Sequence, residues 1–349
     1  MSKGAQSAAW LVRAHHAPGL PSCPHHFTLA DDKRLRGCRN DERSDVHAHY
    51  NQIVRTDATL ADLIDRHVQV CGQHSPRRYR RCHGLPLRLC LSCLVDADHA
   101  DTALFDTGEH SPASNQPRWQ ERLDSLDAYV DGLPSTEDPE RQALRTEFYD
   151  VCRNGSLLTE TPLVSCEGTV GIGKTTALMA WALRKAMVAG ARRIFVIAPF
   201  TAILSQMAKR LRTALVLPGE DEERTLAEHH HRADFSSREA RDNAVLWSTP
   251  IVLTTAVQFF ETLSSNHPGA LRKLHALPGS VIVIDEAHAA LPAPLLQQNW
   301  RWMRELGRDW NCTFVYASGS LARYWEEEEI VSKDGVGELP EIVPPNLAT

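Results

Sequence analysis

The residues best suited to chemistry form the stretch "GTVGIGKT", which runs from Gly168 to Thr175. It fits the pattern G-x-x-x-x-G-K-[ST], in which glycines let backbone N–H groups approach a phosphate closely. An apolar run at 162–167 predicts the strand that the pattern needs before it, and helical spacing from Lys174 predicts the helix after it. The alternative is a plain glycine-rich turn. The candidate ATP-binding residues are Gly168, Gly171, Gly173, Lys174, Thr175 and Thr176.

A second stretch, "VIVIDEAH" at 281–288, ends an apolar run with two acids. The carboxyl edge of a parallel sheet is where an open α/β fold binds its nucleotide. Asp285 and the Thr175 hydroxyl would hold Mg²⁺ there, and Glu286 would orient and deprotonate the attacking water. The candidate catalytic set is Lys174, Asp285, Glu286 and His288.

Length and composition indicate what kind of protein carries these residues. A chain of 349 residues can form two domains, and its formal charge of −6 requires any nucleic-acid partner to be held by a local basic site. Nine cysteines at irregular spacing favour a reducing compartment. Since we find neither a membrane-length apolar run nor a signal pattern, we expect a cytoplasmic protein without a membrane partner.

The composition changes near residue 135. Before it, apolar residues fall mostly at helical spacing, so we expect a mainly α-helical domain over 1–135. The segment "GLPSTEDPE" (132–140) is the best linker candidate. Over 136–349, short apolar runs alternate with helices, which predicts an α/β domain with a parallel sheet covered on both faces. The predicted strands are 162–167, 193–198, 250–255, 280–285 and 312–317.

The letters "DEAH" name a large class of superfamily 2 helicases, and three other segments resemble motifs of that class. "APFTAILSQ" (198–206) resembles the motif that touches the DNA backbone, and "IVLTTAVQFFETL" (251–263) resembles the later threonine motif. "SGS" (318–320) stands where these helicases carry Ser-Ala-Thr, which links hydrolysis to strand movement. The alternative for each is an ordinary helix cap or turn. The resemblance implies DNA contacts by Pro199, Thr201, Gln206, Thr254 and Thr255, and coupling roles for Ser318 and Ser320.

Together with "RAHHAPGLPS" near the N-terminus and "SCLVDADHADT" (92–102), these segments resemble the CRISPR-associated type I effector helicase–nuclease. That family joins an HD-type metal-dependent nuclease to a DEAH-box motor with RecA-like lobes. The resemblance implies a metal site at His15, His16 and Asp98 that takes a divalent transition metal of the Mn, Co, Ni or Fe class. It also implies single-stranded DNA and an RNA-guided surveillance complex as partners.

The sequence also departs from that family. The family's early histidine and His-Asp dyad would precede residue 1, and its second RecA-like lobe would follow "SGS". We therefore expect a piece cut at both ends that binds ATP but has neither a full motor nor a full nuclease site. A separately encoded second lobe would complete the motor. The rivals are a non-catalytic nucleotide-binding module and an unrelated phosphate-loop ATPase whose helical domain binds protein.

Two smaller expectations concern residues outside these motifs. Cys90 and Cys93 lie in an apolar helical stretch, so we expect them to pack as small hydrophobes rather than bind zinc. The consecutive histidines of "EHHHR" (228–232) precede a polar loop, and we expect them to face solvent.

Overall fold

The computed structural model describes residues 84–107, 115–135, 138–155, 161–230, 244–265, 267–290, 296–319, 323–326 and 339–348. The chain divides into two compact units, Met1–His110 with Asn266–His275, and Ser111–Ser265 with Ala276–Thr349. We describe each unit by itself. Most of the domain expected over 1–135 lies outside the described residues, so its boundary stays a prediction.

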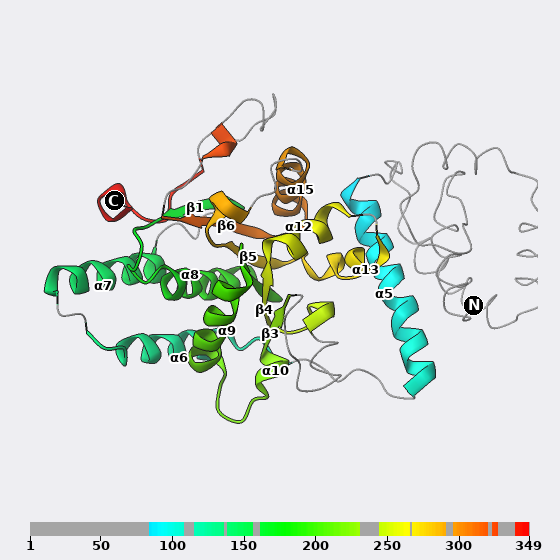
Figure 1. Cartoon of the computed structure of the whole chain (residues 1–349), viewed down its shortest axis with the longest axis horizontal. Coiled ribbons are helices and arrows are strands. Elements are labelled where there is room, and N and C mark those ends of the chain that lie inside the picture. The colour runs from blue at the N-terminus through cyan, green and yellow to red at the C-terminus, as the bar shows by residue number, and fades with distance from the viewer. Residues whose placement is uncertain are drawn as a thin grey trace, which may run out of the picture. The chain divides into compact units, whose positions relative to one another are not determined.

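Six strands of the described chain form one sheet, in the order β1-β6-β5-β2-β4-β3, and each neighbouring pair is parallel (Figure 1). Their bounds are β1 Leu163–Glu167, β2 Arg193–Ala198, β3 Leu226–His229, β4 Ile251–Thr255, β5 Ser280–Ile284 and β6 Thr313–Ser318. Nearly every strand residue is buried, as expected for strands covered on both faces. The predicted parallel α/β fold is confirmed, and β3 is an additional strand.

Helices pack on both faces of the sheet (Figure 1). One layer consists of α6 (Trp119–Asp131), α7 (Pro139–Asn154), α8 (Lys174–Ala189) and α9 (Thr201–Leu215). Val196 of β2 joins the core beneath this layer, whereas its neighbour Phe195 contacts Trp247 on the other side. That second side carries α12 (Ala256–Ser264) and α15 (Leu296–Asp309). The shorter elements are α10 (Glu222–Thr225), α14 (Ala287–Ala290), α17 (Pro345–Ala348), η1 (Leu274–Ala276) and η3 (Tyr324–Glu326).

The segment 132–140, expected to be a linker, includes the start of α7. The Asp138 carboxylate accepts hydrogen bonds from the N–H groups of Glu140 (3.0 Å) and Arg141 (3.3 Å), which makes it the N-cap. Pro139 fits the first helical turn because its missing N–H would have no partner there. The Asp-Pro pair is therefore a helix start rather than part of a linker.

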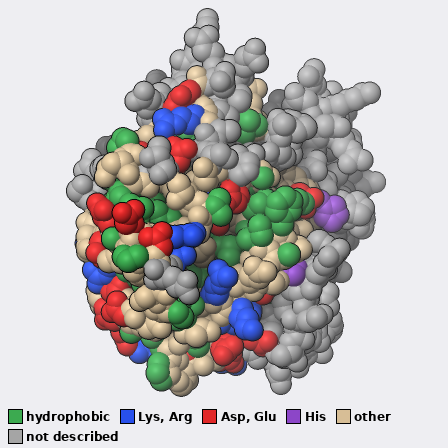
Figure 2. Space-filling view, turned by 60° about the vertical axis from the view of Figure 1, so that its left-hand side comes forward, with side chains coloured by type: hydrophobic (Ala, Val, Ile, Leu, Met, Phe, Trp, Pro, Cys, Tyr) green, Lys and Arg blue, Asp and Glu red, His purple; other side chains and the backbone are tan. Residues whose placement is uncertain are grey.

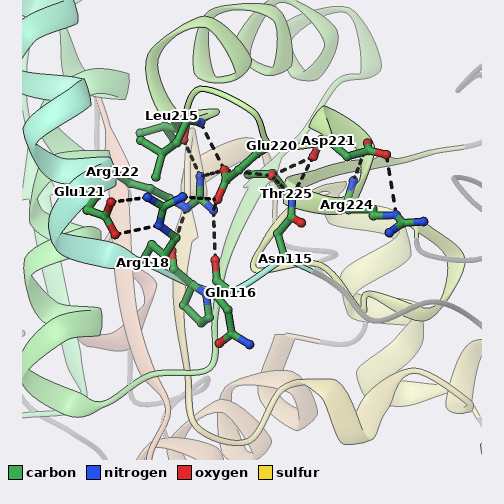
Figure 3. A network of polar contacts seen from close by, with 12 residues as sticks. Asn115, Gln116, Arg118, Glu121, Arg122, Leu215, Glu220, Asp221, Arg224 and Thr225 are labelled. Atoms are coloured by element: carbon green, nitrogen blue, oxygen red, sulfur yellow. Dashed lines mark hydrogen bonds and ion pairs between the residues drawn. The ribbon is translucent and has the colours of Figure 1, made fainter.

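A buried ion pair holds α6 to the segment that follows α9 (Figure 3). Arg122 is fully buried, and its guanidinium donates to the Glu220 carboxylate at 2.8 and 3.0 Å. Its other N–H groups donate to backbone carbonyls of Gln116, Pro117 and Leu215. All five donors of the guanidinium therefore have an acceptor.

The segment 339–348 covers the outer edge of β1. The N–H of Ser165 donates to Pro340 O (2.9 Å), and the N–H of Ile342 donates to Ser165 O (2.8 Å). The Glu341 carboxylate accepts from the N–H of Glu167 at 2.8 Å. This pairing satisfies backbone groups on the exposed side of an edge strand.

Two histidines of the segment 228–232 do not face solvent, so that prediction is wrong for them. His229 belongs to β3, and its Nδ1 accepts a hydrogen bond from the indole N–H of Trp247 at 3.0 Å. His230 is buried, with Nε2 2.7 Å from a Glu228 carboxylate oxygen. The reason is that β3 pairs with β4 and draws these side chains into the lobe.

In the first unit, α5 (Leu85–Thr107) packs against α13 (Pro268–Leu271) and the residues after it. The Ser92 hydroxyl donates to Arg272 O (3.1 Å) and accepts from the N–H of His275 (3.0 Å). Asp96 pairs with the Arg272 guanidinium at 2.7 Å. These contacts fix the segment 267–275 along α5.

Cys90 and Cys93 are both exposed on α5, so the expectation that they pack as small hydrophobes is wrong. The buried side of this part of the helix consists of Leu89, Ser92 and Val95 instead. None of the described helices combines the length and the apolar composition that a bilayer crossing requires.

Candidate functional site

The loop between β1 and α8 has the close approaches that its glycines make possible. Gly171 (φ +82°) and Gly173 (φ +95°) adopt the left-handed conformation in which a side chain is strained. A Cβ on Gly168 would lie 2.7 Å from the ring of Phe148, so α7 packs directly on the loop. The N–H of Gly168 donates to Ser318 O at 3.2 Å and joins the loop to β6.

Helix α8 begins at this loop with an N-terminus suited to an anion. Gly173 is its N-cap and supplies no side-chain cap, so no side chain competes for the first-turn N–H groups. The hydroxyl of Thr176 turns back to donate to Gly173 O at 2.9 Å. Open N–H donors and the positive end of the helix dipole together favour a phosphate here.

Lys174 is the buried cation of the site. Its side chain is 9% exposed, and its Nζ atom has no hydrogen-bond partner. The nearest acid is Glu286, whose Oε1 lies 3.6 Å from Nζ. A Cβ on Gly319 would lie 3.3 Å from the same Nζ, so the glycine at the centre of "SGS" leaves room beside the ammonium. A buried ammonium without hydrogen bonds is costly, and an anionic ligand would relieve that cost.

The two predicted acids follow β5 directly and face the same loop. Asp285 is buried, and its Oδ1 accepts the N–H of Glu286 at 3.0 Å. Burial raises the pKa of Asp285, and the charge of Glu286 raises it further. Glu286 has φ +49°, a conformation that costs a non-glycine residue about 1–3 kcal/mol. That backbone places its carboxylate between Lys174 and the Ser318 hydroxyl, which donates to Oε2 at 3.2 Å.

The residues present fit a magnesium ion. Thr175 and Asp285 line the same small cavity between α8, α9 and the sheet, whose six other lining residues are apolar, so the two oxygen ligands lie at its polar end. Hydroxyl and carboxylate oxygens are ligands that Mg²⁺ prefers, and the raised pKa of Asp285 is the sign of a carboxylate that lacks a full counter-charge. A divalent cation bound there would supply that charge and bridge to the phosphates of a nucleotide.

The predicted DNA-contact residues fall into two groups. Pro199 and Thr201 are half-buried and Gln206 is exposed, all around the start of α9. Thr254 and Thr255 are buried. Thr254 donates its hydroxyl to His229 O (3.0 Å), and the Thr255 hydroxyl accepts the N–H of Gln258 (3.4 Å) at the N-cap of α12. Their hydroxyls thus bond within the lobe.

The remaining predicted residues are only partly described. Ser318 is buried beside Glu286, while Ser320, His15 and His16 lie outside the described residues. His288 lies on α14, and its side chain is not described. Asp98 lies on α5, half-buried. Within the described part of the chain, no group of three or more His, Cys, Asp or Glu side chains could hold a metal ion.

One residue of the site had no signal in the motifs. Arg145 of α7 donates from Nε (3.0 Å) and Nη2 (2.8 Å) to Gly171 O in the phosphate loop. Arg141 lies one helical turn earlier, and its Nη2 would be 2.6 Å from a Cβ on Gly171. The Asp-Pro pair at the helix start would have revealed α7. The contact of Arg145 with the phosphate loop, however, depends on tertiary packing.

Comparisons with known proteins find similar helicases. Residues 154–324 match the family described as DEAD/DEAH box helicase. The crystal structure of T. fusca Cas3 is similar with a TM-score of 0.53 and 20% identity, over 94% of this chain and 42% of that chain. The Pyrococcus furiosus Hef helicase domain matches with a TM-score of 0.38 and 19% identity, over 56% of this chain and 36% of that one.

The helicase MrfA, in a structure bound to DNA, matches with a TM-score of 0.40 and 14% identity, over 66% of this chain and 29% of that one. The chain thus spans less than half the length of these solved structures. No curated protein sequence matches it. The parallel sheet and the likeness to the solved Cas3 structure show the RecA-like fold, and residues 154–324 match the DEAD/DEAH box helicase family.

Proposed function

We propose that this chain binds ATP with Mg²⁺ as the nucleotide-binding part of a motor that acts on single-stranded DNA. The observation that carries the proposal is the Lys174 ammonium, buried and without a hydrogen bond, at a loop that also presents open helix N–H groups. Burying an ammonium without hydrogen bonds costs free energy, and a bound phosphate would offset that cost.

Each residue then has a role. Lys174 would neutralise the phosphates of a bound nucleotide, and Thr175 and Asp285 would hold Mg²⁺, which would supply further positive charge there. Glu286 accepts the proton of the attacking water, because its carboxylate lies at the open side of the loop beside Lys174. The Ser318 hydroxyl orients that carboxylate and joins it to β6, so a change at the phosphates reaches the end of a neighbouring strand.

The test is an equilibrium titration with a fluorescent ATP analogue, with and without Mg²⁺. Lys174→Ala should lower affinity about 30-fold or more, because it removes one partner of a buried charge pair. Lys209→Ala, an exposed lysine of α9, is the matched control and should bind as the wild type does. Glu286→Gln should bind but not hydrolyse. Equal affinity of the wild type and Lys174→Ala would refute the proposal, and binding without any hydrolysis would favour a non-catalytic nucleotide-binding module.

For DNA we propose a path along Pro199, Thr201 and Gln206, which are accessible at the carboxyl edge of β2. Thr254 and Thr255 form hydrogen bonds within the lobe, so they would position the neighbouring backbone rather than contact DNA directly. Basic and acidic side chains are interspersed over the described part of the face in Figure 2. That described part has no broad basic field, and we propose a local contact.

The role in type I CRISPR interference, with an RNA-guided surveillance complex as partner, rests on the sequence resemblance. So do the nuclease site at His15, His16 and Asp98, its transition metal, and a separately encoded second lobe. Cleavage of single-stranded DNA with Mn²⁺, Co²⁺ or Ni²⁺ tests the nuclease site. Because the site is expected to be incomplete, cleavage by the wild type should be weak, and Asp98→Ala should abolish it. Equal cleavage by the wild type and Asp98→Ala would refute the site.

A further inference from the structure

Three apolar side chains are exposed where two neighbouring strands end. Phe200 is 59% exposed, Val257 is 60% exposed and Ile203 is 36% exposed. Phe200 is the one aromatic residue among the exposed large apolar side chains of the described residues. Other rings of this lobe, such as Trp247 and Phe259, are fully buried. Exposure of a phenylalanine ring therefore needs a local explanation.

The strand register places Phe200 and Val257 at the same edge of the sheet. Ala198, the last residue of β2, pairs with Thr255, the last residue of β4. Phe200 and Val257 each stand two residues beyond that pair, at the carboxyl edge of the sheet. Phe200 is the extended N-cap residue of α9, and Ile203 lies in the first turn of the same helix. We call these three residues the Phe200 patch.

The size of the Phe200 patch favours a small planar occupant. A stable protein interface engages roughly 20–30 residues on each side, whereas this patch has three apolar side chains. A nucleobase needs one ring to stack on and a little apolar surface beside it. Half-buried Thr201 and exposed Gln206 adjoin the patch along α9 and offer polar groups to a sugar or phosphate.

We propose that the Phe200 patch is a stacking platform for one base of single-stranded DNA, with the Phe200 ring against the base and Val257 and Ile203 at its rim. This inference rests on the proposed function, which supplies the DNA. It adds that the strand is held here by the face of a base rather than by its phosphates. Stacking of this kind tolerates any base, because every base has a flat aromatic face.

The experiment measures anisotropy of a fluorescein-labelled oligodeoxythymidine and of the same oligonucleotide with abasic sites. Phe200→Ala should weaken binding of the normal oligonucleotide about 5- to 150-fold, the range for loss of one base stack. Phe200→Trp should restore it. Val188→Ala, which removes an equally exposed apolar side chain from the end of α8, should bind as the wild type does.

Two further readouts separate stacking from damage to the fold or from a phosphate contact. The wild type and Phe200→Ala should bind the abasic oligonucleotide equally, and the dependence of affinity on salt should be the same for both. An equal loss on both oligonucleotides would overturn the inference, with the unfolding midpoint of Phe200→Ala as the check on folding. A shift of the chain from oligomer to monomer in Phe200→Ala, seen by sedimentation, would assign the patch to protein contact instead.

Failure of the inference differs from failure of the proposed function. If the wild type binds neither oligonucleotide, the proposed action on DNA is refuted and the platform with it. If the wild type binds DNA and Phe200→Ala binds it equally well, the proposed function stands and the platform alone is refuted.

Discussion

Two buried charge clusters in the same lobe have opposite hydrogen bonding. Around Arg122, every N–H of the guanidinium has an acceptor, and the Glu220 carboxylate also accepts from Thr225 and from the N–H of Leu217. Around Lys174, the ammonium has no hydrogen bond and lies 3.6 Å from the Glu286 carboxylate. The first cluster is complete by itself, whereas the second is completed by a phosphate on our proposal.

The pKa values of the two buried acids differ in the same way. Burial tends to raise the pKa of Glu220, but hydrogen bonds from Arg122 and from the N–H of Leu217 outweigh it, and the pKa is lowered. Burial raises the pKa of Asp285, and the charge of Lys174 and the N–H of Glu286 lower it too little to reverse the shift. We call the cluster around Arg122 saturated, because its hydrogen bonds are complete, and the cluster around Lys174 unsaturated. On the proposed function, the unsaturated cluster gives up stability in exchange for binding.

The largest effect should come from breaking the saturated cluster. Arg122→Ala leaves Glu220 buried without its partner, so the free energy of unfolding should fall by about 3–5 kcal/mol. Arg118→Ala removes a more exposed arginine from the same carboxylate and should cost less than about 1 kcal/mol. Urea unfolding at neutral pH, followed by circular dichroism, measures both.

If Arg122→Ala does not fold, the double variant Arg122→Ala, Glu220→Ala still decides the question. Removing the orphaned carboxylate should recover part of the loss. Similar small losses for Arg118→Ala and Arg122→Ala would show that the cluster is not a structural centre.

A smaller effect of opposite sign is expected at the unsaturated cluster. The raised pKa of Asp285 means that the folded chain loses stability as pH rises from about 3.9, the usual aspartate value, through the folded-state value. Asp285→Asn should therefore raise the free energy of unfolding at neutral pH by on the order of 1 kcal/mol without nucleotide. It should have no such effect below about pH 3.9.

The control for that experiment is Asp309→Asn, since the Asp309 carboxylate is exposed beside Arg308. Its stability should stay within about 0.5 kcal/mol of the wild type at either pH. Glu220 provides a comparison within the wild type, because its pKa is lowered in the folded chain. Its ionised carboxylate therefore stabilises the fold above about pH 4.3, and this stability is lost as the pH falls through the pKa of the folded chain. Unchanged or reduced stability of Asp285→Asn at neutral pH would contradict the contrast between the clusters.

The smallest effect should come from Arg145, which positions the phosphate loop from outside. Arg145→Ala removes two hydrogen bonds to Gly171 O, so affinity for an ATP analogue should fall about 2- to 10-fold. Its free energy of unfolding should change by less than about 1 kcal/mol, because the bonds are exposed. Arg192→Ala, an exposed arginine at the amino end of β2, should change neither quantity. A larger loss of stability than of affinity would make Arg145 a structural residue.

The phosphate loop and five of the strands could be predicted because their signals are local. Each of those strands is a continuous apolar run, and glycine is required wherever the loop has positive φ. Asp285 could be placed because it follows such a run directly.

Other features depend on tertiary packing. All residues of β4 are buried, so its sequence has no alternation that would show whether Thr254 faces inward or outward. The bonds of Arg145 to Gly171 O depend on how α7 packs. Phe200 stands between two residues that a motif singled out, and its exposure follows from where α9 begins.

The pairing of β1 with β6 has a consequence for the order of folding. Among the described strands, β1 is synthesised first and β6 last, yet they are neighbours in the sheet, and the N–H of Gly168 bonds to Ser318 O. Contacts between residues so distant in sequence form slowly, because the chain between them must first be ordered. A nascent chain would thus make its phosphate loop early and hold it in shape only after β6 had left the ribosome. ATP could then stabilise only a finished sheet.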